Sequence, residues 1–362
     1  MNTMINTFRR RTTVLAFLAA VLAAVLAAGC ATAPAPSGDY SAPTALSPVV
    51  RRGALDAGLE ERILALDPER VSDADVRTVL ARGPTPRIMN LHGGIYPVHL
   101  LMEDFSQFLI GMGYPEDKIR DLGDQSLSRS PYESAEQQAG MIAWYYEREG
   151  LRPFLIGHSQ GGIQTVKILH VLAGAFDSNL HPFNPLTHEF ESRTTIVDPL
   201  TGRERPVVGV SLAYASAVGT GGWSLALPVH WMIFTRIRTI PDTVDEFTGY
   251  RIGVDFFAWD APGFEGVKTF HAGGKANVRN VTLPAEYNHV FVPHSDHLVQ
   301  DKATRDWINA FNPNDEAHWP PLPDGNTLNI LWAADVWHSI KRHWVLEAQR
   351  YVRARHGTVA AN

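Results

Sequence analysis

The residues of this chain that most clearly could do chemistry form a short motif in mid-sequence, Gly157-His158-Ser159-Gln160-Gly161, with Gly162 behind it. A serine hydroxyl is a weak nucleophile until a histidine takes its proton, and it can then attack an acyl carbon. Glycines on both sides would let a strand and a helix pass close together at a sharp turn around the serine. Ser159 is therefore the candidate nucleophile.

The residues that flank this motif predict the elements that such a turn requires. Residues 152–156 are a short apolar run, typical of a buried parallel strand. A mostly apolar helix is predicted directly after the motif, ending near Gly174. The order is strand, turn with serine, helix.

This arrangement resembles the nucleophile elbow of the α/β-hydrolases, and in particular of bacterial lipases and esterases. A second motif, Leu91-His92-Gly93-Gly94, ends a predicted strand at 86–91 and resembles the loop that precedes the first helix of those proteins. The resemblance covers roughly residues 86–311. It implies an α/β fold with a mostly parallel, doubly wound sheet and helices on both faces, and a chain order of serine, acid, histidine.

Three histidines follow Ser159 at positions where the base could lie. His289 comes a few residues after 278–284, the predicted last strand, and order and spacing favour it. His297 becomes the better choice if 290–293 is the true last strand, and His294 is the third candidate.

Two aspartates are candidates for the acid that orients the base. Asp255 ends the turn Gly253-Val254-Asp255, after a predicted strand that contains Tyr250 and Ile252. Asp260 follows the apolar run 256–259 and is a close alternative. Either one could also be an ordinary loop residue.

The resemblance implies an oxyanion hole made of two backbone N–H groups. One belongs to Gln160, at the positive end of the helix after the serine. The other is expected from the loop of the second motif, at Gly94, where a small residue lets the backbone approach the substrate oxygen. His92 would orient this loop.

No metal or cofactor is expected from the sequence. His294, Asp296 and His297 are close enough to suggest a metal site, but their spacing matches no zinc motif. The chain has no phosphate-binding loop and no dinucleotide fingerprint. A net charge of −6 and a pI near 6.2 argue against nucleic acid as a partner.

The first 30 residues predict a signal peptide. Three arginines at 9–11 precede an apolar run at 14–28 that is short for a membrane span. The run ends in Leu26-Ala27-Ala28-Gly29-Cys30, which resembles the lipobox of bacterial lipoproteins, although Ala27 stands where leucine is usual. The expectation is an exported envelope protein with a lipid anchor on Cys30, its only cysteine. The alternative is an ordinary secretory signal.

The rest of the chain predicts a tether and one domain. Residues 31–48 are rich in Ala, Pro and Ser and predict a disordered linker, while 49–362 suit a single α/β domain. Two insertions are expected, at about 177–206 and 222–246. The apolar stretch within the second, 223–240, is either core packing or a lid over the serine.

Several helices are predicted outside the motifs. One covers 54–66, and another covers 73–81 with Ser72 as its cap and Asp75 three residues on. A further helix is expected to open at Ser130-Pro131-Tyr132-Glu133 and to run to Gly150.

The function expected from the resemblance is hydrolysis of small-molecule or lipid esters with an apolar acyl group, through an acyl-enzyme on Ser159. Two alternatives remain. One is a catalytically silent hydrolase fold that binds an apolar ligand or partner at the envelope. The other is an acyltransferase that uses the same serine.

Overall fold

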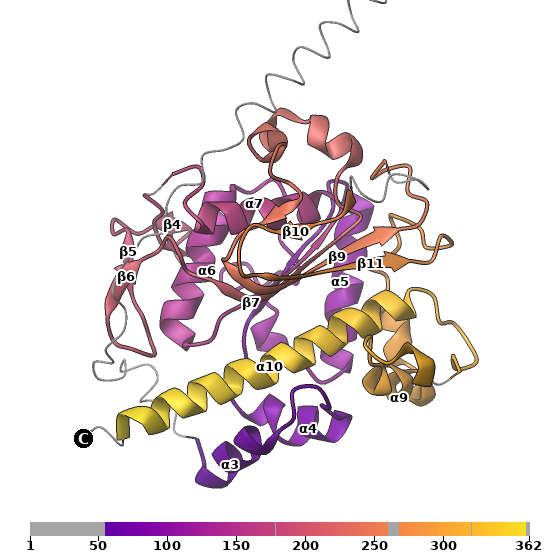
Figure 1. Cartoon of the computed structure of the whole chain (residues 1–362), viewed down its shortest axis with the longest axis horizontal. Coiled ribbons are helices and arrows are strands. Elements are labelled where there is room, and N and C mark those ends of the chain that lie inside the picture. Colours follow the sequence, from indigo (N-terminus) through magenta and orange to yellow (C-terminus); the bar gives the residue numbers. More distant parts are fainter. Residues whose placement is uncertain (1–54, 178, 260–267, 320, 360–362) are drawn as a thin grey trace, which may run out of the picture.

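The computed structural model describes residues 55–177, 179–259, 268–319 and 321–359 (Figure 1). The predicted signal peptide, the lipobox with Cys30, the tether and the candidate acid Asp260 lie outside this part of the chain.

The centre of the fold is a five-stranded sheet in which each strand runs parallel to its neighbours. The first four of its strands consist mainly of buried residues, as expected when both faces of a parallel sheet are covered, whereas the last strand, at the edge, is mostly exposed or half-buried. The spatial order is β1 (Ile88–Leu91), β2 (Phe154–His158), β7 (Leu212–Val218), β9 (Val244–Ile252), β11 (Asn277–Leu283). The predicted α/β architecture with a parallel sheet is confirmed.

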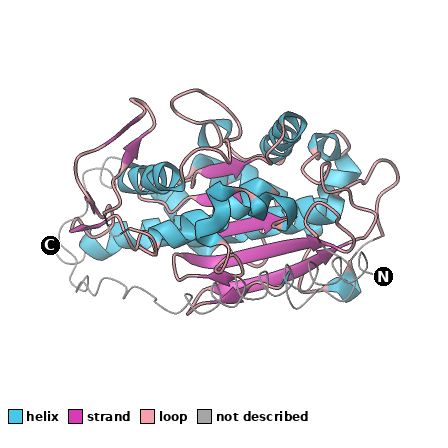
Figure 2. Ribbon diagram, turned by 90° about the horizontal axis from the view of Figure 1, so that it is seen from above, coloured by secondary structure: helices cyan, strands magenta, loops and turns pink. Residues whose placement is uncertain are grey.

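Helices cover both faces of this sheet (Figure 2). Successive side chains of a strand point to opposite faces, so Phe154 joins one hydrophobic cluster and Leu155 the other. The cluster around Leu155 includes α6 (Ala135–Glu149) and α7 (Gln160–Leu172). The cluster around Phe154 includes residues of α3 (Ala57–Ala65), α4 (Asp73–Thr78), α5 (Tyr96–Gly111), α9 (Lys302–Ala310) and α10 (Ile330–Val359).

The expected doubly wound strand order is not found among the described strands. Their order in space equals their order in sequence, from β1 to β11, without a reversal. The second face is covered instead by α5, which shares the β1–β2 connection with α6, and by helices from the two ends of the domain.

Both predicted insertions contain regular structure. The first holds two antiparallel pairs, β3 (Phe183–Asn184) with β4 (Glu189–Phe190), and β5 (Thr195–Val197) with β6 (Glu204–Pro206). The second holds two 3₁₀ turns, η3 (Gly222–Ala226) and η4 (Pro228–Ile233), and then β8 (Thr239–Ile240), which pairs with β10 (His271–Ala272). It is shorter than expected, because β9 already begins at Val244.

Helix starts followed the sequence in one case and departed from it in another. Ser72 caps α4 and exchanges hydrogen bonds with Asp75, as predicted. The prediction of a helix start at Ser130 was wrong, because Ser134 accepts the capping hydrogen bond from Gln137 N–H, so α6 begins at Ala135. Four further 3₁₀ turns complete the described elements, η1 (Leu80–Arg82), η2 (Glu116–Lys118), η5 (Asp296–Val299) and η6 (Glu316–His318).

The long C-terminal helix α10 was not predicted. It buries Trp332, Trp337 and Trp344, and it packs against α3 along the lower side of Figure 1. Near its end, Nε2 of His356 lies 2.7 Å from a carboxylate oxygen of Glu60 in α3.

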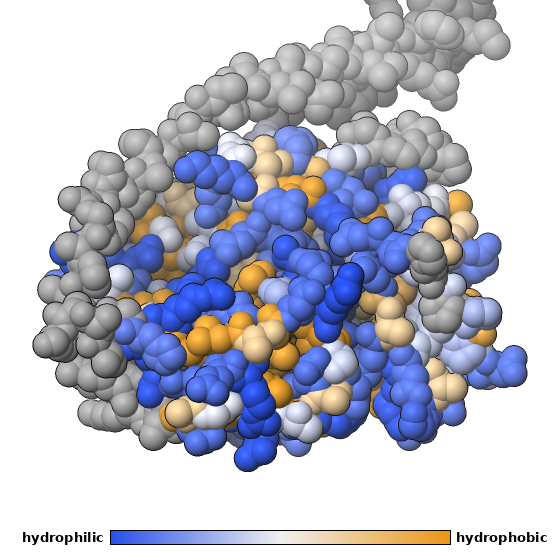
Figure 3. Space-filling model, turned by 60° about the horizontal axis from the view of Figure 1, so that its bottom comes forward, coloured by the Kyte–Doolittle hydropathy of each residue, from blue (hydrophilic) through white to orange (hydrophobic). Residues whose placement is uncertain are grey.

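The face that Figure 3 turns forward is mostly hydrophilic, with a smaller hydrophobic patch among the polar side chains. Among the described helices, none is both long and apolar enough to span a bilayer.

Candidate active site

Ser159 lies at the sharp junction between β2 and α7. Its backbone angles, φ 55° and ψ −115°, fall in a region that residues with a β-carbon rarely adopt. Its N–H donates to the carbonyl of Val218 at 2.8 Å, which ties the junction to the end of β7. The serine is therefore held at the carboxyl end of the sheet.

Two glycines of the motif permit close backbone contacts at this junction. A β-carbon on Gly161 would overlap the carbonyl oxygen of Leu91, and one on Gly157 would overlap the carbonyl of Gly161. Helix α7 thus passes directly against the end of β1, as the motif requires.

The structure brings Ser159, His289 and Asp255 together. Nε2 of His289 lies 2.8 Å from the Ser159 hydroxyl oxygen, and Nδ1 lies 2.6 Å from Oδ2 of Asp255. Asp255 follows β9 and His289 follows β11, so both reach the serine from the carboxyl ends of neighbouring parallel strands. With Nδ1–H donating to the carboxylate, Nε2 is free to accept the serine proton.

The other candidate histidines lie elsewhere. Residues 290–293 form turns instead of a last strand. The segment that follows them, which includes η5, packs against α5. There, Nδ1 of His294 lies 2.7 Å from Oδ2 of Asp104, and the ring of His297 lies beside that of His294, with centroids 4.9 Å apart.

The Asp255 carboxylate is buried and held by its own loop. Its side chain is fully shielded from solvent, and Oδ1 accepts the Ala258 N–H at 3.0 Å. The carbonyl of Ala258 accepts in turn from the Lys268 ammonium at 2.5 Å. The carboxylate is thereby held by its own loop as well as by His289.

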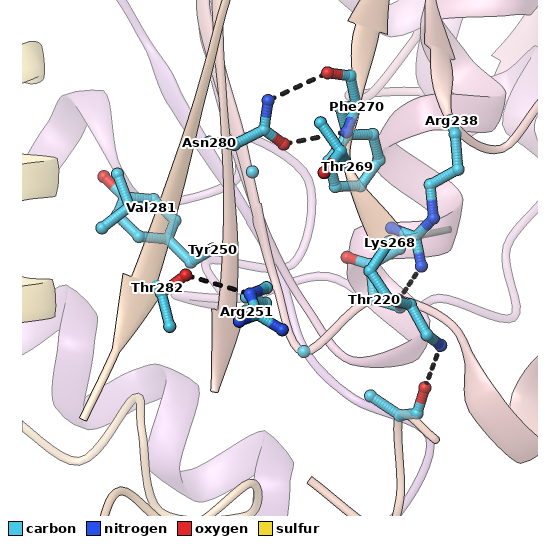
Figure 4. Close-up of a pocket in the computed structure, with 13 residues that line it drawn as sticks. Thr220, Arg238, Tyr250, Arg251, Lys268, Thr269, Phe270, Asn280, Val281 and Thr282 are labelled. Atoms are coloured by element: carbon cyan, nitrogen blue, oxygen red, sulfur yellow. Dashed lines mark hydrogen bonds between the residues drawn. The ribbon is translucent and has the colours of Figure 1, made fainter. Parts of the chain in front are cut away.

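A cavity of about 140 Å³ lies beside this loop (Figure 4). Lys268 and Arg238 line it, and Arg238 donates to the carbonyl of Thr220 at 2.8 Å, in the loop after β7. The two cations therefore hold the loops after β7 and β9.

His158 is a contributor that the sequence reasoning missed. Its fully buried Nε2–H donates to the backbone carbonyl of His289 at 2.7 Å, which fixes the loop that carries the base. Burial, reinforced by the neighbouring imidazole of His289, lowers the pKa of His158 to about 3. The ring is therefore neutral at ordinary pH, as a single N–H donor requires. It occupies a freely variable position of the motif, so the spacing gave no signal.

The loop after β1 lies against the elbow. A β-carbon on Gly93 would come 3.3 Å from the β-carbon of Ser159, and one on Gly94 would overlap the side-chain oxygen of Gln160. Gln160 is the first residue of α7, where backbone N–H groups lack partners within the helix. Both predicted N–H donors thus belong to segments in contact with the serine.

Two side chains hold this loop. The Tyr132 hydroxyl, which the sequence reasoning missed, donates to the carbonyl of Gly94 at 2.8 Å. His92 has Nδ1 2.7 Å from the carbonyl of Gly93, and burial lowers its pKa, so it donates from a neutral ring.

Large exposed apolar side chains follow the same strand ends as the candidate triad. They occur after β1, in and next to η4 after β7, in the Asp255 loop after β9, and in the His289 loop after β11. Because the carboxyl ends of parallel strands share one edge, these segments follow the same edge of the sheet as the serine. We call them the apolar rim: Ile95, Tyr96, Leu227, Val229, Trp231, Met232, Phe234, Val254, Phe256, Phe257, Trp259 and Phe291.

No protein-family model and no curated protein sequence matches this chain. Among solved structures, an esterase domain from a Rhodothermus marinus protein is 12% identical, with 63% of this chain and 84% of that chain covered and a TM-score of 0.29. A second structure, RedJ with a PEG molecule bound in the active site, is 15% identical over 65% of this chain and 90% of that chain, with a TM-score of 0.30. At these TM-scores neither structure carries a conclusion about this chain.

Proposed function

We propose that this protein is a serine hydrolase of the α/β-hydrolase kind that cleaves carboxylic esters with an apolar acyl group. The observation that carries the proposal is the imidazole of His289, set between the Ser159 hydroxyl at 2.8 Å and the buried Asp255 carboxylate at 2.6 Å. A serine, a base and an orienting acid in this geometry are the parts that acyl transfer to serine needs.

The reaction would begin when Oγ of Ser159 attacks the acyl carbon while Nε2 of His289 takes the hydroxyl proton. Asp255 stabilises the imidazolium that forms. The negative charge that develops on the former carbonyl oxygen is met by the N–H groups of Gln160 and Gly94, and each such donor contributes about 3 kcal/mol to transition-state stabilisation.

The second half of the reaction uses the same groups. The imidazolium of His289 returns its proton to the leaving alkoxide, so an alcohol departs and an ester of Ser159 remains. A water molecule then gives a proton to His289 and attacks this ester. The acid is released and the serine regains its proton.

The apolar rim supports the choice of substrate class. Large apolar side chains left exposed around a site mark a surface that binds apolar ligands. The ring of Phe257 lies with its centroid 5.3 Å from that of His289, so apolar surface reaches the candidate base itself. We assign η4 and the residues next to it, within the stretch 223–240, as a lid segment on the same ground.

Replacing the nucleophile tests this proposal directly. We expect Ser159→Ala to lower turnover of p-nitrophenyl butyrate at least about 1,000-fold, because the acyl-enzyme cannot form, with little change in Tm. The wild-type protein should hydrolyse butyrate faster than acetate if the rim binds the acyl chain.

Covalent labelling by a fluorophosphonate separates the possible failures. Labelling at Ser159 without ester turnover, followed by transfer of the acyl group to an added alcohol, would identify an acyltransferase. An unlabelled, folded wild-type protein would contradict the enzymatic proposal and leave a binding protein. Equal turnover by Ser159→Ala and the wild type would remove the assigned nucleophile.

A further inference from the structure

Three potential metal ligands meet shortly after the His289 loop. One ring nitrogen each of His294 and His297 and one carboxylate oxygen of Asp296 all lie within 4.8 Å of one another. All three side chains are half-buried, at the start of η5.

A fourth group, from a distant part of the sequence, completes the cluster. Asp104, in the middle of α5, has Oδ2 2.7 Å from Nδ1 of His294. On its other side, the same nitrogen lies 3.4 Å from Oδ1 of Asp296. Because Nδ1 of His294 donates its N–H to the Asp104 carboxylate, Nε2 of the same ring is left as its metal-binding nitrogen.

Several polar atoms of the cluster are shielded from solvent and poorly satisfied. Neither ring nitrogen of His297 makes a well-formed hydrogen bond within the described part of the chain, although the backbone of Leu328 lies nearby. Oδ1 of Asp296 likewise lacks a hydrogen-bond donor there. Buried polar atoms normally have partners, because an unmade hydrogen bond costs free energy. A cation among these atoms would satisfy them.

We propose that His294, Asp296 and His297 bind one divalent transition-metal ion of the zinc class. Two imidazoles and a carboxylate suit Zn²⁺, Co²⁺ or Ni²⁺, whereas Ca²⁺ and Mg²⁺ prefer oxygen ligands alone. Asp104 is the positioning residue of this site. Its carboxylate accepts a hydrogen bond from the ring of His294, as carboxylates commonly do for metal-bound histidines.

The site lies where it would stiffen the candidate active site without touching the substrate. It joins the segment that follows His289 to α5, and α5 begins directly after the loop that follows β1 and contains Gly94. Asn329 holds the same stretch from another side, donating to the carbonyls of Phe291 and His294 at 2.7 Å and 3.0 Å. A bound ion would add a third attachment to this stretch, so we infer a structural role for it.

Zinc binding to metal-free protein tests the proposal independently of catalysis. Full-length protein is stripped with a chelator and titrated with ZnCl₂ by calorimetry and by Tm. We expect one zinc per chain, a higher Tm with zinc, and reversal by chelator. Asp104→Asn should weaken zinc binding about 10- to 100-fold, and His297→Ala by more, since it removes a ligand instead of its orienting partner.

A matched control comes from a histidine with a carboxylate neighbour elsewhere. His356→Ala, which loses the pairing with Glu60, should bind zinc as the wild type does. If His297→Ala is unstable, His294→Gln serves as the second ligand variant. The proposal is overturned if wild-type protein binds zinc no more tightly than the folded ligand variants, or if its Tm does not respond to the metal. Because binding and Tm are read without substrate, failure here leaves the proposed hydrolase function untouched, and the reverse also holds.

Discussion

Ser159 presents its hydroxyl by way of a backbone conformation that costs roughly 1–3 kcal/mol. The surrounding contacts must offset that cost, and the hydrogen bond from its N–H to Val218 at 2.8 Å is one of them. A less strained turn would be more stable but would move the hydroxyl away from Nε2 of His289. The strained backbone of Ser159 therefore supports its assignment as the nucleophile, because the strain occurs at the residue where the proposed chemistry needs an exposed hydroxyl.

Asp255 is the residue at which the proposed mechanism is most sharply tested. Asp255→Asn should lower kcat/KM about 10⁴-fold, because the amide no longer holds the base in the productive tautomer. The measurement is ester turnover at pH 7 to 8. The matched control is Asp260→Asn, five residues further on, which should retain near wild-type turnover. A large loss of turnover in Asp260→Asn, with little loss in Asp255→Asn, would identify Asp260 as the acid.

The candidate triad residues could be predicted from the sequence because of their order along the chain. Serine, acid and histidine follow one another in the order that the resemblance implies, and the favoured residues are those that the structure brings together. The partners of His158 and His294 could not be predicted. They lie 131 and 190 residues away, and only the folded chain makes them neighbours.

Among the elements, α10 is attached to the sheet by a buried carboxylate, Glu347, that pairs with two partly buried arginines. The Glu347 side chain is 1% exposed and lies 2.7 Å from Arg152, which precedes β2, and 2.6 Å from Arg350. Burial is the largest single effect and would raise the pKa of Glu347, but the charges and hydrogen bonds of the two guanidiniums together outweigh it and hold the pKa below its usual range. The carboxylate therefore stays charged and joins the helix to the sheet.

Removing this carboxylate should be costly. We expect Glu347→Ala to lower the free energy of unfolding by about 3 kcal/mol, because Arg350 loses its buried counter-ion and Arg152 keeps only the more exposed Asp245. Urea denaturation measures the change. Glu69→Ala provides a matched control, since Glu69 pairs with Arg342 at the surface and should contribute no more than about 1 kcal/mol. Equal losses in the two variants would show that Glu347 does not anchor α10.

Buried polar residues also explain why the sequence concealed this helix. Asp335, Lys341 and Glu347 occupy inward positions of α10, where an amphipathic pattern would place apolar residues. The strands and α7 were predictable because most of their buried positions are occupied by apolar residues or glycine. The helix start at Ser130 was misplaced for another reason, since two serines four residues apart offer competing caps and only tertiary contacts choose between them.

The molecule as a whole buries several neutral histidines. Burial lowers the pKa of His158 to about 3, and it lowers those of His230 and His338 to about 4. In the unfolded chain each takes up a proton as the pH falls through about 6.5, whereas in the folded protein it does not. The folded state is thus fully favoured above pH 6.5 and loses stability as the pH falls toward 4.

This predicts a steep loss of stability in mild acid. Between pH 6.5 and 4.5 the free energy of unfolding should fall by up to roughly 1.4 kcal/mol per pH unit for each of the three histidines. His338→Leu removes one of them without touching the candidate active site, and it should make the fall measurably shallower. Denaturation curves at half-unit steps of pH provide the measurement. An unchanged slope would mean that His338 binds its proton equally well in both states.

Because α3 and α10 lie together, with Glu60 beside His356, the first and the last described helices bring the two ends of the described part of the chain close to each other. The described chain is therefore suited to circular permutation. Joining its two ends by a short linker and opening the ring at a surface turn, such as the one between β5 and β6, would keep every strand in place. A circularly permuted protein of this kind could carry a fused protein at a new position on its surface, while Ser159, His289 and Asp255 keep their relative positions.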